Sequence, residues 1–248
     1  MQNKSIFVTG GNSGIGLATA LVFARAGADI AIFARRAEHN EKARALIEAE
    51  GRRCLTFSGE VSDETAIRDA VAATMRSFGG LHYGFNNAGT NHPAVPITEL
   101  SVADCDRQMD VNVKGTFLGM KYMIPAIKAS GGGAICNNAS TGGIAPTACQ
   151  ALYAAAKAAV IGMTKVAALE CAKDGVRVNV VCPGATTGEM FHRFAEANPE
   201  RAAMAVSKHP LGRIGDKEEV ASAVLFLCRD ATFTTGHAFV VDGGRLLN

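Results

Sequence analysis

The chain contains 248 residues, of which 48% are hydrophobic and 27 are glycine. This length and composition suit one α/β domain, spanning residues 1–248, with a substantial buried core. The 25 basic and 23 acidic residues give a net charge of +2. A balance this close to neutral argues against binding to nucleic acid or to an anionic membrane surface.

The seven cysteines are odd in number, show no CxxC spacing and lie mostly in apolar segments. They are typical of reduced, buried thiols, so we expect a cytoplasmic protein without a metal site. A strand-like segment begins at Ser5, and we therefore expect no signal peptide. We also expect no membrane span, because polar residues, glycine and proline interrupt the long uncharged stretch 129–156.

Short apolar segments alternate with helical patterns along the whole chain. The expected strands are 5–9, 29–33, 54–57, 83–86, 134–138, 177–182 and 238–241, and the expected helices are near 16–26, 38–50, 63–78, 101–129, 151–173 and 217–229. Ser101 with Asp104, and Asp216 with Glu219, are helix start signals. The alternation predicts a doubly wound α/β domain with a mostly parallel seven-stranded sheet and helices on both faces. Residues 184–209 form the one long irregular stretch, which we interpret as a lid.

A glycine-rich loop directly follows the first expected strand and precedes a helix. Its glycines allow a tight turn and close approach of the backbone to a pyrophosphate, which the helix N-terminus attracts. A plain glycine turn is the alternative. The predicted dinucleotide-binding residues here are Gly10, Asn12, Ser13, Gly14, Ile15 and Gly16.

Two arginines stand where the second expected strand ends, about 20 residues past the glycine loop. An acidic residue at this place would bind an adenosine ribose, but the chain has Arg35 and Arg36. Guanidinium groups suit a 2′-phosphate, so we predict that NADP(H) is preferred over NAD(H). The alternative is that one arginine is only a solvated strand end.

Tyr153 and Lys157 are four residues apart in a segment rich in good helix formers, so both side chains lie on one helix face. An adjacent cation favours the phenolate, and we expect Lys157 to lower the pKa of Tyr153. Ser140 follows a strand, and the turn at Gly142 and Gly143 lets its hydroxyl face the tyrosine. These residues predict a site for a carbonyl oxygen with a general acid/base. The alternative is a packed ring beside a solvated amine.

Further motifs follow in a fixed order. They are Asn86-Asn87-Ala88-Gly89, Asn112 within Asp110–Gly115, Pro183-Gly184, and Val241-Asp242-Gly243-Gly244. With the glycine loop, Ser140 and Tyr153-x-x-x-Lys157, they make the chain resemble the short-chain dehydrogenase/reductase family, which has a Rossmann fold, over essentially its whole length. Within that family the sequence is similar to 3-oxoacyl-carrier-protein reductases.

The resemblance implies a role for each matching residue. Tyr153 is the expected general acid/base, Ser140 orients the carbonyl, and Lys157 binds the nicotinamide ribose and lowers the tyrosine pKa. Asn112 is expected to hold a water that links Lys157 to solvent. The further cofactor contacts implied are Glu60, Val61, Asn87, Gly89, Pro183, Gly184 and Thr186, while Asn86 suits a structural role at least as well.

Two positions depart from the family pattern. Glu60 stands where the family often has aspartate, and Thr186-Thr187-Gly188 follows Pro183-Gly184, so a threonine is missing at 188. The substrate pocket is expected to be largely apolar, with contributions from Asn91, His92, Pro93, Gly142, Ile144, Cys149, Met190, Phe191 and Phe194. His92 is more simply read as a bystander than as a second acid.

We therefore expect an enzyme that transfers hydride between NADP(H) and a ketone or secondary alcohol of apolar character. The first alternative is a 3-oxoacyl-carrier-protein or other 3-oxoacyl thioester reductase, which Asp174 and the glycines 131–133 disfavour. The second alternative is a nucleotide-binding regulator without turnover. By resemblance the protein is expected to be a homotetramer whose interfaces use helices 101–129 and 151–173 and the last strand.

Overall fold

The structure is a computed structural model that describes residues 1–247, apart from the side chains of Met190 and Arg201. Within these residues, seven strands form one sheet in the order β3-β2-β1-β4-β5-β6-β7, with every neighbouring pair parallel. The strands are β1 (Ser5–Thr9), β2 (Asp29–Ala34), β3 (Cys54–Ser58), β4 (Tyr83–Asn86), β5 (Gly133–Asn138), β6 (Val176–Pro183) and β7 (Ala238–Val241). The predicted doubly wound α/β sheet is confirmed.

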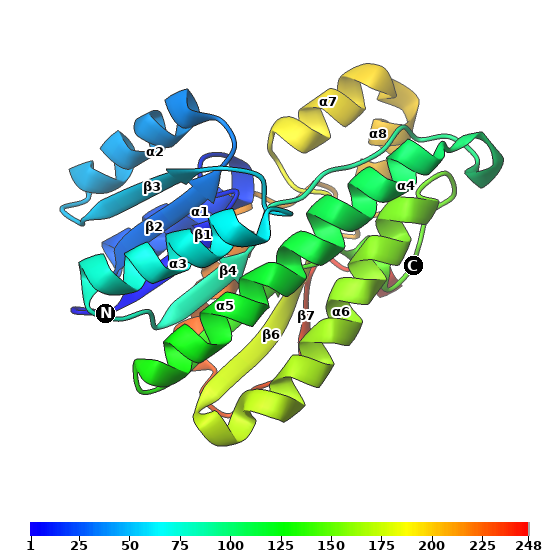
Figure 1. Cartoon of the computed structure of the whole chain (residues 1–248). Helices are drawn as coiled ribbons and strands as arrows, with labels where there is room; N and C mark the ends of the chain where they lie inside the picture. Colours follow the sequence, from blue (N-terminus) through cyan, green and yellow to red (C-terminus); the bar gives the residue numbers. More distant parts are fainter. Residues whose placement is uncertain (248) are drawn as a thin grey trace.

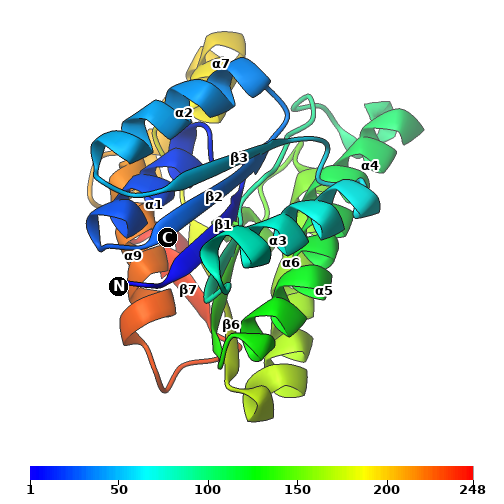
Figure 2. The same cartoon turned by 60° about the vertical axis from the view of Figure 1, so that its left-hand side comes forward.

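Helices cover both faces of this sheet, and each face has its own apolar cluster (Figures 1 and 2). In β1, Ile6 and Val8 belong to one cluster and Phe7 to the other, because successive side chains of a strand point to opposite faces. One face carries α1 (Gly14–Arg25), α2 (Ala37–Ala49) and α9 (Lys217–Leu225); the other carries α3 (Glu64–Phe78), α5 (Gly115–Ala129) and α6 (Ala151–Cys171). Every residue of β1 and β2 is buried, as expected for parallel strands between two helical layers.

The predicted single helix over 101–129 is wrong. The structure has α4 (Val102–Gln108), a π-helical turn (Met109–Lys114) and then α5. The start signal is confirmed: Ser101 Oγ accepts from the Asp104 N–H at 3.1 Å, and Asp104 Oδ2 accepts from the Ser101 N–H at 3.1 Å. No glycine or proline occurs between 102 and 114, so no local signal marks the change of helix type. The last predicted helix likewise ends in a π-helical turn, Phe226–Asp230.

The prediction that 184–209 is irregular is also wrong. This segment contains α7 (Glu189–Ala197) and α8 (Pro199–Ser207), which stand beyond the strands at one end of the sheet (Figure 1). Pro199 is the first residue of α8, a position where its missing N–H costs nothing. Each helix has nine residues, too few for an apolar period to be told apart from an irregular stretch.

By length and composition alone, the helix Ala151–Asp174 could cross a membrane, and no other helix in residues 1–247 meets that test. Its first part, α6, packs against β6 and carries the buried Lys157. Core helices often pass such a test, so this helix is weak evidence for a membrane span.

Candidate active site

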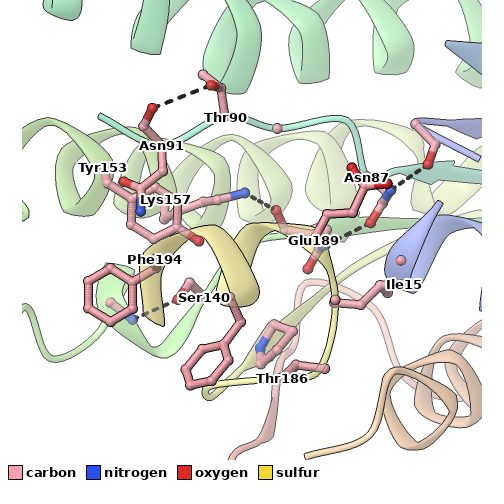
Figure 3. A pocket seen from close by; sticks show the side chains of 18 of the residues that line it. Ile15, Asn87, Thr90, Asn91, Ser140, Tyr153, Lys157, Thr186, Glu189 and Phe194 are labelled. Carbon is pink, nitrogen blue, oxygen red and sulfur yellow. Dashed lines mark hydrogen bonds between the residues drawn. The ribbon is translucent and has the colours of Figure 1, made fainter. Parts of the chain in front are cut away.

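A cavity of about 680 Å³ opens at the carboxyl ends of the strands, where the loops after all seven strands of the sheet meet the α7–α8 segment. In doubly wound sheets this edge is the usual place for ligands. Tyr153, Lys157, Ser140 and Phe194 lie on one side, and Ile15 and Asn87 on the other (Figure 3). The predicted site residues that line the cavity are Gly10, Asn12, Ser13, Gly14, Ile15, Arg35, Arg36, Glu60, Val61, Asn87, Gly89, Ser140, Tyr153, Lys157, Pro183, Gly184 and Thr186.

Gly16 and Asn112 are the two predicted site residues outside this lining. A Cβ at Gly16 would overlap the Gly10 carbonyl oxygen, so Gly16 permits close packing of α1 against the loop. Gly10 and Gly14 have φ of 64° and 52°, in the left-handed region that glycine adopts readily. The glycine loop is therefore shaped by its backbone.

The N-terminus of α1 fits an anionic ligand. Ser13 is the N-cap residue but its side chain makes no capping hydrogen bond, and a Cβ at Gly14 would meet open space. Ser13, Gly14 and Ile15 all line the cavity. Uncapped N–H groups and the helix dipole at this place suit the pyrophosphate of a dinucleotide.

Asparagine side chains connect the ends of three strands. Asn87 Nδ2 donates to the carbonyl oxygens of Thr9 and Gly10, both at 3.2 Å, and its Oδ1 accepts from Asn138 Nδ2 at 2.9 Å. Asn86 instead donates to Asn137 Oδ1 at 2.8 Å within the core, which is a structural role. The loops that frame the cavity are thus held to one another by partly buried amides.

Lys157 is buried, and its Nζ donates to the Asn138 carbonyl oxygen at 2.8 Å. Nζ lies 5.6 Å from the centroid of the Tyr153 ring. Burial lowers the pKa of Lys157 to about 8, because water no longer solvates its ammonium group. A small change of surroundings can therefore shift this amine between its charged and neutral forms near neutral pH.

The expected depression of the Tyr153 pKa is not found. Burial raises the pKa of the phenol above its ordinary value, and a hydrogen bond with Ser140 opposes this rise. The Lys157 ammonium points to the Asn138 carbonyl rather than to the phenol oxygen, so its charge does not offset the desolvation. Ser140 Oγ also accepts from the Gly142 N–H at 3.0 Å, which fixes the hydroxyl beside the ring.

Asn112 lies in the π-helical turn, a feature that is frequent at functional sites. Its Oδ1 accepts from the Thr90 N–H at 2.9 Å, and its Nδ2 donates to Thr90 O at 3.0 Å and to Gln108 Oε1 at 2.7 Å. A Cβ at Gly89 would lie 3.0 Å from Asn112 Oδ1 and 3.6 Å from Lys157 Nζ. The Asn112 side chain thus holds the loop after β4 beside Lys157.

Both arginines at the end of β2 face carboxylates from other loops. Arg35 Nη1 lies 3.8 Å from Glu60 Oε1, and Arg36 Nη2 lies 3.3 Å from Glu189 Oε2 of α7. All four side chains are about half exposed, so each pair is weak. Glu189 connects the lid to the end of β2, a contact that sequence reasoning missed.

The substrate end differs in part from the expectation. Asn91, Gly142, Cys149, Phe191 and Phe194 line the cavity. His92, Pro93 and Ile144 do not: His92 is buried with Nδ1 2.6 Å from Pro93 O, and Ile144 is exposed. Met190 lies outside the described side chains. Cys149 has a φ of 65°, a strained value for a residue with a side chain, at the cavity wall.

His209 is a second residue that sequence reasoning missed. Its Nε2 accepts from the Ala185 N–H at 3.2 Å, and its Nδ1 lies 2.7 Å from Ala205 O. It therefore ties the end of the lid to the loop after β6. Thr187 Oγ1 accepts from the Lys217 N–H at 3.2 Å. This bond holds Thr186-Thr187-Gly188, the segment whose sequence differs from the family pattern, to the start of α9.

Known proteins match this chain over nearly its full length. A family model described as "Enoyl-(Acyl carrier protein) reductase" matches residues 10–245. The cyclohexanol dehydrogenase of an Acinetobacter species is 40% identical over 243 residues, covering 98% of this chain and 94% of that protein. This protein is a short-chain dehydrogenase/reductase.

Other members of the short-chain dehydrogenase/reductase family also match this chain over nearly its full length, in sequence and in structure. The 2,5-dichloro-2,5-cyclohexadiene-1,4-diol dehydrogenase of Sphingobium indicum is 38% identical over 247 residues, covering 98% of this chain and 97% of that protein. The crystal structure of levodione reductase matches with a TM-score of 0.94 at 32% identity, covering 99% of this chain and 98% of that one. Carveol dehydrogenase from Mycobacterium avium, solved in complex with NAD, matches with a TM-score of 0.95 at 26% identity, covering 100% and 99%.

This short-chain dehydrogenase/reductase is accordingly an enzyme, an oxidoreductase acting on CH–OH groups with a nicotinamide dinucleotide. The uncapped α1 N-terminus and the open space at Gly14 fit that cofactor.

Proposed function

We propose that this protein interconverts a ketone and a secondary alcohol of apolar character, with NADP(H) preferred over NAD(H). The grouping of Ser140, Tyr153 and Lys157 at the cavity opposite the glycine loop carries this proposal. Two relatives are named for the oxidation of ring alcohols, a cyclohexanol and a cyclohexadienediol. Six-membered cyclic ketones and alcohols are therefore the first substrates to test.

Each polar residue has a distinct proposed role. Tyr153 exchanges a proton with the substrate oxygen, and Ser140, whose hydroxyl lies beside the Tyr153 ring, orients that oxygen. Lys157 supplies a proton to the site, because its pKa of about 8 lets it exist in both forms. Asn112 keeps the loop after β4 in place beside Lys157. A bound nicotinamide dinucleotide supplies the hydride.

The cofactor preference rests on Arg35 and Arg36, which line the cavity at the end of β2 without an acidic residue of that strand beside them. A 2′-phosphate would take over guanidinium contacts that Glu60 and Glu189 now make. Both carboxylates are exposed enough to return to water at little cost.

The cofactor preference is tested by dissociation constants for NADPH and NADH. Arg35→Ser and Arg36→Ser are each expected to weaken NADPH binding about tenfold, with little change for NADH. Glu189→Gln should strengthen NADPH binding alone, since it frees Arg36. Arg44→Ser, on the exposed surface of α2, is the control. Equal losses of affinity for NADPH and NADH would show that the arginines do not bind the 2′-phosphate.

The reaction is tested by following oxidation of NADPH, and separately of NADH, with cyclohexanone, aryl ketones, aliphatic ketones, diketones and 3-oxoacyl thioesters. We expect turnover of ring ketones with NADPH. Fastest turnover of the thioesters would favour the second candidate, a 3-oxoacyl thioester reductase. The description of the matching family model shares with this candidate only the acyl-carrier substrate, because an enoyl reductase reduces a C=C bond. The enzyme names of the relatives disfavour a regulator without turnover.

We further propose one domain over residues 1–248, a cytoplasmic location and a homotetramer. None of the seven cysteines forms a disulfide within residues 1–247, and five are buried, which supports a reducing compartment. Equilibrium unfolding with a single transition seen by two probes would support one domain.

A further inference from the structure

Arg245 follows the Val241-Asp242-Gly243-Gly244 motif and lines the cavity beside the loop that leads into α6. Its Nη2 donates to Thr147 Oγ1 at 2.9 Å. Its Nη1 is buried and has no hydrogen-bond partner among residues 1–247. A buried guanidinium N–H without an acceptor is costly, so the Arg245 side chain is stabilised by any rotation that brings Nη1 to an acceptor in the cavity.

The backbone around Arg245 is held in place. Asp242 Oδ1 accepts from the Gly244 N–H at 2.9 Å, and Asp242 Oδ2 accepts from the Leu246 N–H at 2.8 Å. The Arg245 N–H itself donates to Asp242 O at 3.1 Å. The turn is therefore held by hydrogen bonds on both sides of Arg245.

Lys208, at the end of α8, is a second cation of this region. A Cβ at Gly244 would lie 3.0 Å from Pro210 Cγ, so the segments that carry Arg245 and Lys208 are in contact. Both residues line the cavity, and neither takes part in an ion pair among the described residues. Arg193 of the lid, by contrast, lies 3.6 Å from Glu189.

We propose that Arg245, assisted by Lys208, forms a subsite for a carboxylate carried by the substrate. The inference rests on the proposed carbonyl chemistry of the same cavity and narrows its substrate to an oxo or hydroxy acid. The acid has an apolar body, which Phe191 and Phe194 of the lid contact, and a carboxylate remote from the reacting carbon.

The chemistry of the subsite favours this ligand. A carboxylate accepts two parallel N–H bonds from a guanidinium, so a rotation of the Arg245 side chain that brings Nη1 to the cavity gives this atom the acceptor that it lacks among residues 1–247. Lys208 adds positive charge without a fixed direction. A methyl ester of the same acid has the same apolar body but no charge, so it loses the charge-assisted bonds.

The test compares 3- and 4-oxocyclohexanecarboxylate with their methyl esters, using NADPH. We expect kcat/KM of the wild type to favour at least one acid over its ester about tenfold or more, mainly through KM. Arg245→Met should remove this preference and Arg245→Lys should retain part of it. Arg229→Met, whose native side chain pairs with Asp230 on the surface, should keep the preference unchanged.

Binding without turnover gives an independent readout. In the presence of NADP, calorimetry is expected to show saturable binding of cyclohexanecarboxylate to the wild type, at least about tenfold weaker in Arg245→Met. The inference is overturned if the wild type prefers both esters, if Arg245→Met keeps the acid preference, or if cyclohexanecarboxylate does not bind. Turnover of cyclohexanone without an acid preference would reject the subsite alone. No turnover of any ketone would reject the proposed function.

Discussion

Tyr153 is the residue on which the proposed proton transfer depends. Tyr153→Phe removes only the hydroxyl, so we expect the fold and NADPH binding to persist while kcat falls about 100-fold or more. Tyr122→Phe is the matched control, because Tyr122 OH bonds Glu64 on the surface at 2.7 Å. Steady-state kinetics with cyclohexanone measure the effect. Turnover of Tyr153→Phe close to that of the control would refute the mechanism.

Lys157 links stability to pH. Its folded-state pKa of about 8 lies below the ordinary 10.5, so below pH 8 the folded state carries the whole cost of a buried charge, about 3 kcal/mol. As pH rises from 8 to 10.5, the unfolded chain keeps a proton that the folded protein has released, and the cost disappears. Stability relative to Lys157→Met is therefore expected to rise by up to about 3 kcal/mol across this window.

Urea unfolding of the wild type and Lys157→Met, at steps from about pH 7 to about pH 10.5, measures this rise. A difference in unfolding free energy that stays constant with pH would contradict it. The comparison also separates Lys157 from other groups, because those titrate equally in both proteins.

Sequence alone predicted residues whose chemistry is local. The glycine loop, Arg35, Arg36 and the Tyr153–Lys157 pair are each recognised within a few neighbouring positions. Glu189 is different, because it meets Arg36 across 153 positions of sequence, and so is Arg245, which reaches Thr147 across 98. The prediction that Lys157 lowers the pKa of Tyr153 was wrong because it also depends on residues distant in sequence. Burial of the phenol and the direction of the Lys157 side chain are both set by the assembled fold.

At the scale of single elements, every strand was predicted within one residue at each end. The predictions for 101–129, as a single helix, and for 184–209, as an irregular segment, were wrong. Strand limits follow from short apolar segments that are buried on both faces. The π-helical turn Met109–Lys114 has no such local cause, and α7 and α8 are stabilised by contact with each other rather than by a long amphipathic period.

Gly119 sets the contact between α5 and β4. A Cβ at Gly119 would overlap the amide of Asn86, whose Nδ2 bonds Asn137 in the core. We expect Gly119→Ala to lower the free energy of unfolding by about 1–3 kcal/mol, measured by urea denaturation. In an Asn86→Ala background the same change should cost clearly less, because the overlapping amide is gone. Equal costs in both backgrounds would show that the clash is relieved elsewhere.

For the whole molecule, the outer faces of α4, α5 and α6 are where the proposed tetramer would place contacts between copies of the chain. Val102, Phe117, Val166 and Leu169 are 77%, 47%, 54% and 82% exposed. Apolar surface of this kind on neighbouring helices is typical of an interface.

Sedimentation velocity is expected to show a tetramer at micromolar concentration. Gly162→Glu should shift it to smaller species: a side chain at Gly162 meets nothing within 4 Å inside the protomer, but it would place a charge between packed helices. Unchanged far-ultraviolet circular dichroism serves as the control for folding. A stable wild-type monomer would reject the assembly.

Met1 precedes the amino end of β1, and Arg245 follows the carboxyl end of β7, so these two residues lie at opposite ends of the parallel strands (Figure 1). The Met1 ammonium donates to Ala26 O at 2.6 Å, beside the start of β2, whereas Arg245 lines the cavity and Leu247 is exposed. An affinity tag or a tether to a solid support that is joined before Met1 therefore departs away from the cavity. The same tether joined at the other end would begin shortly after Arg245, which lines the cavity. Immobilisation through the N-terminal side is the arrangement that leaves the catalyst usable.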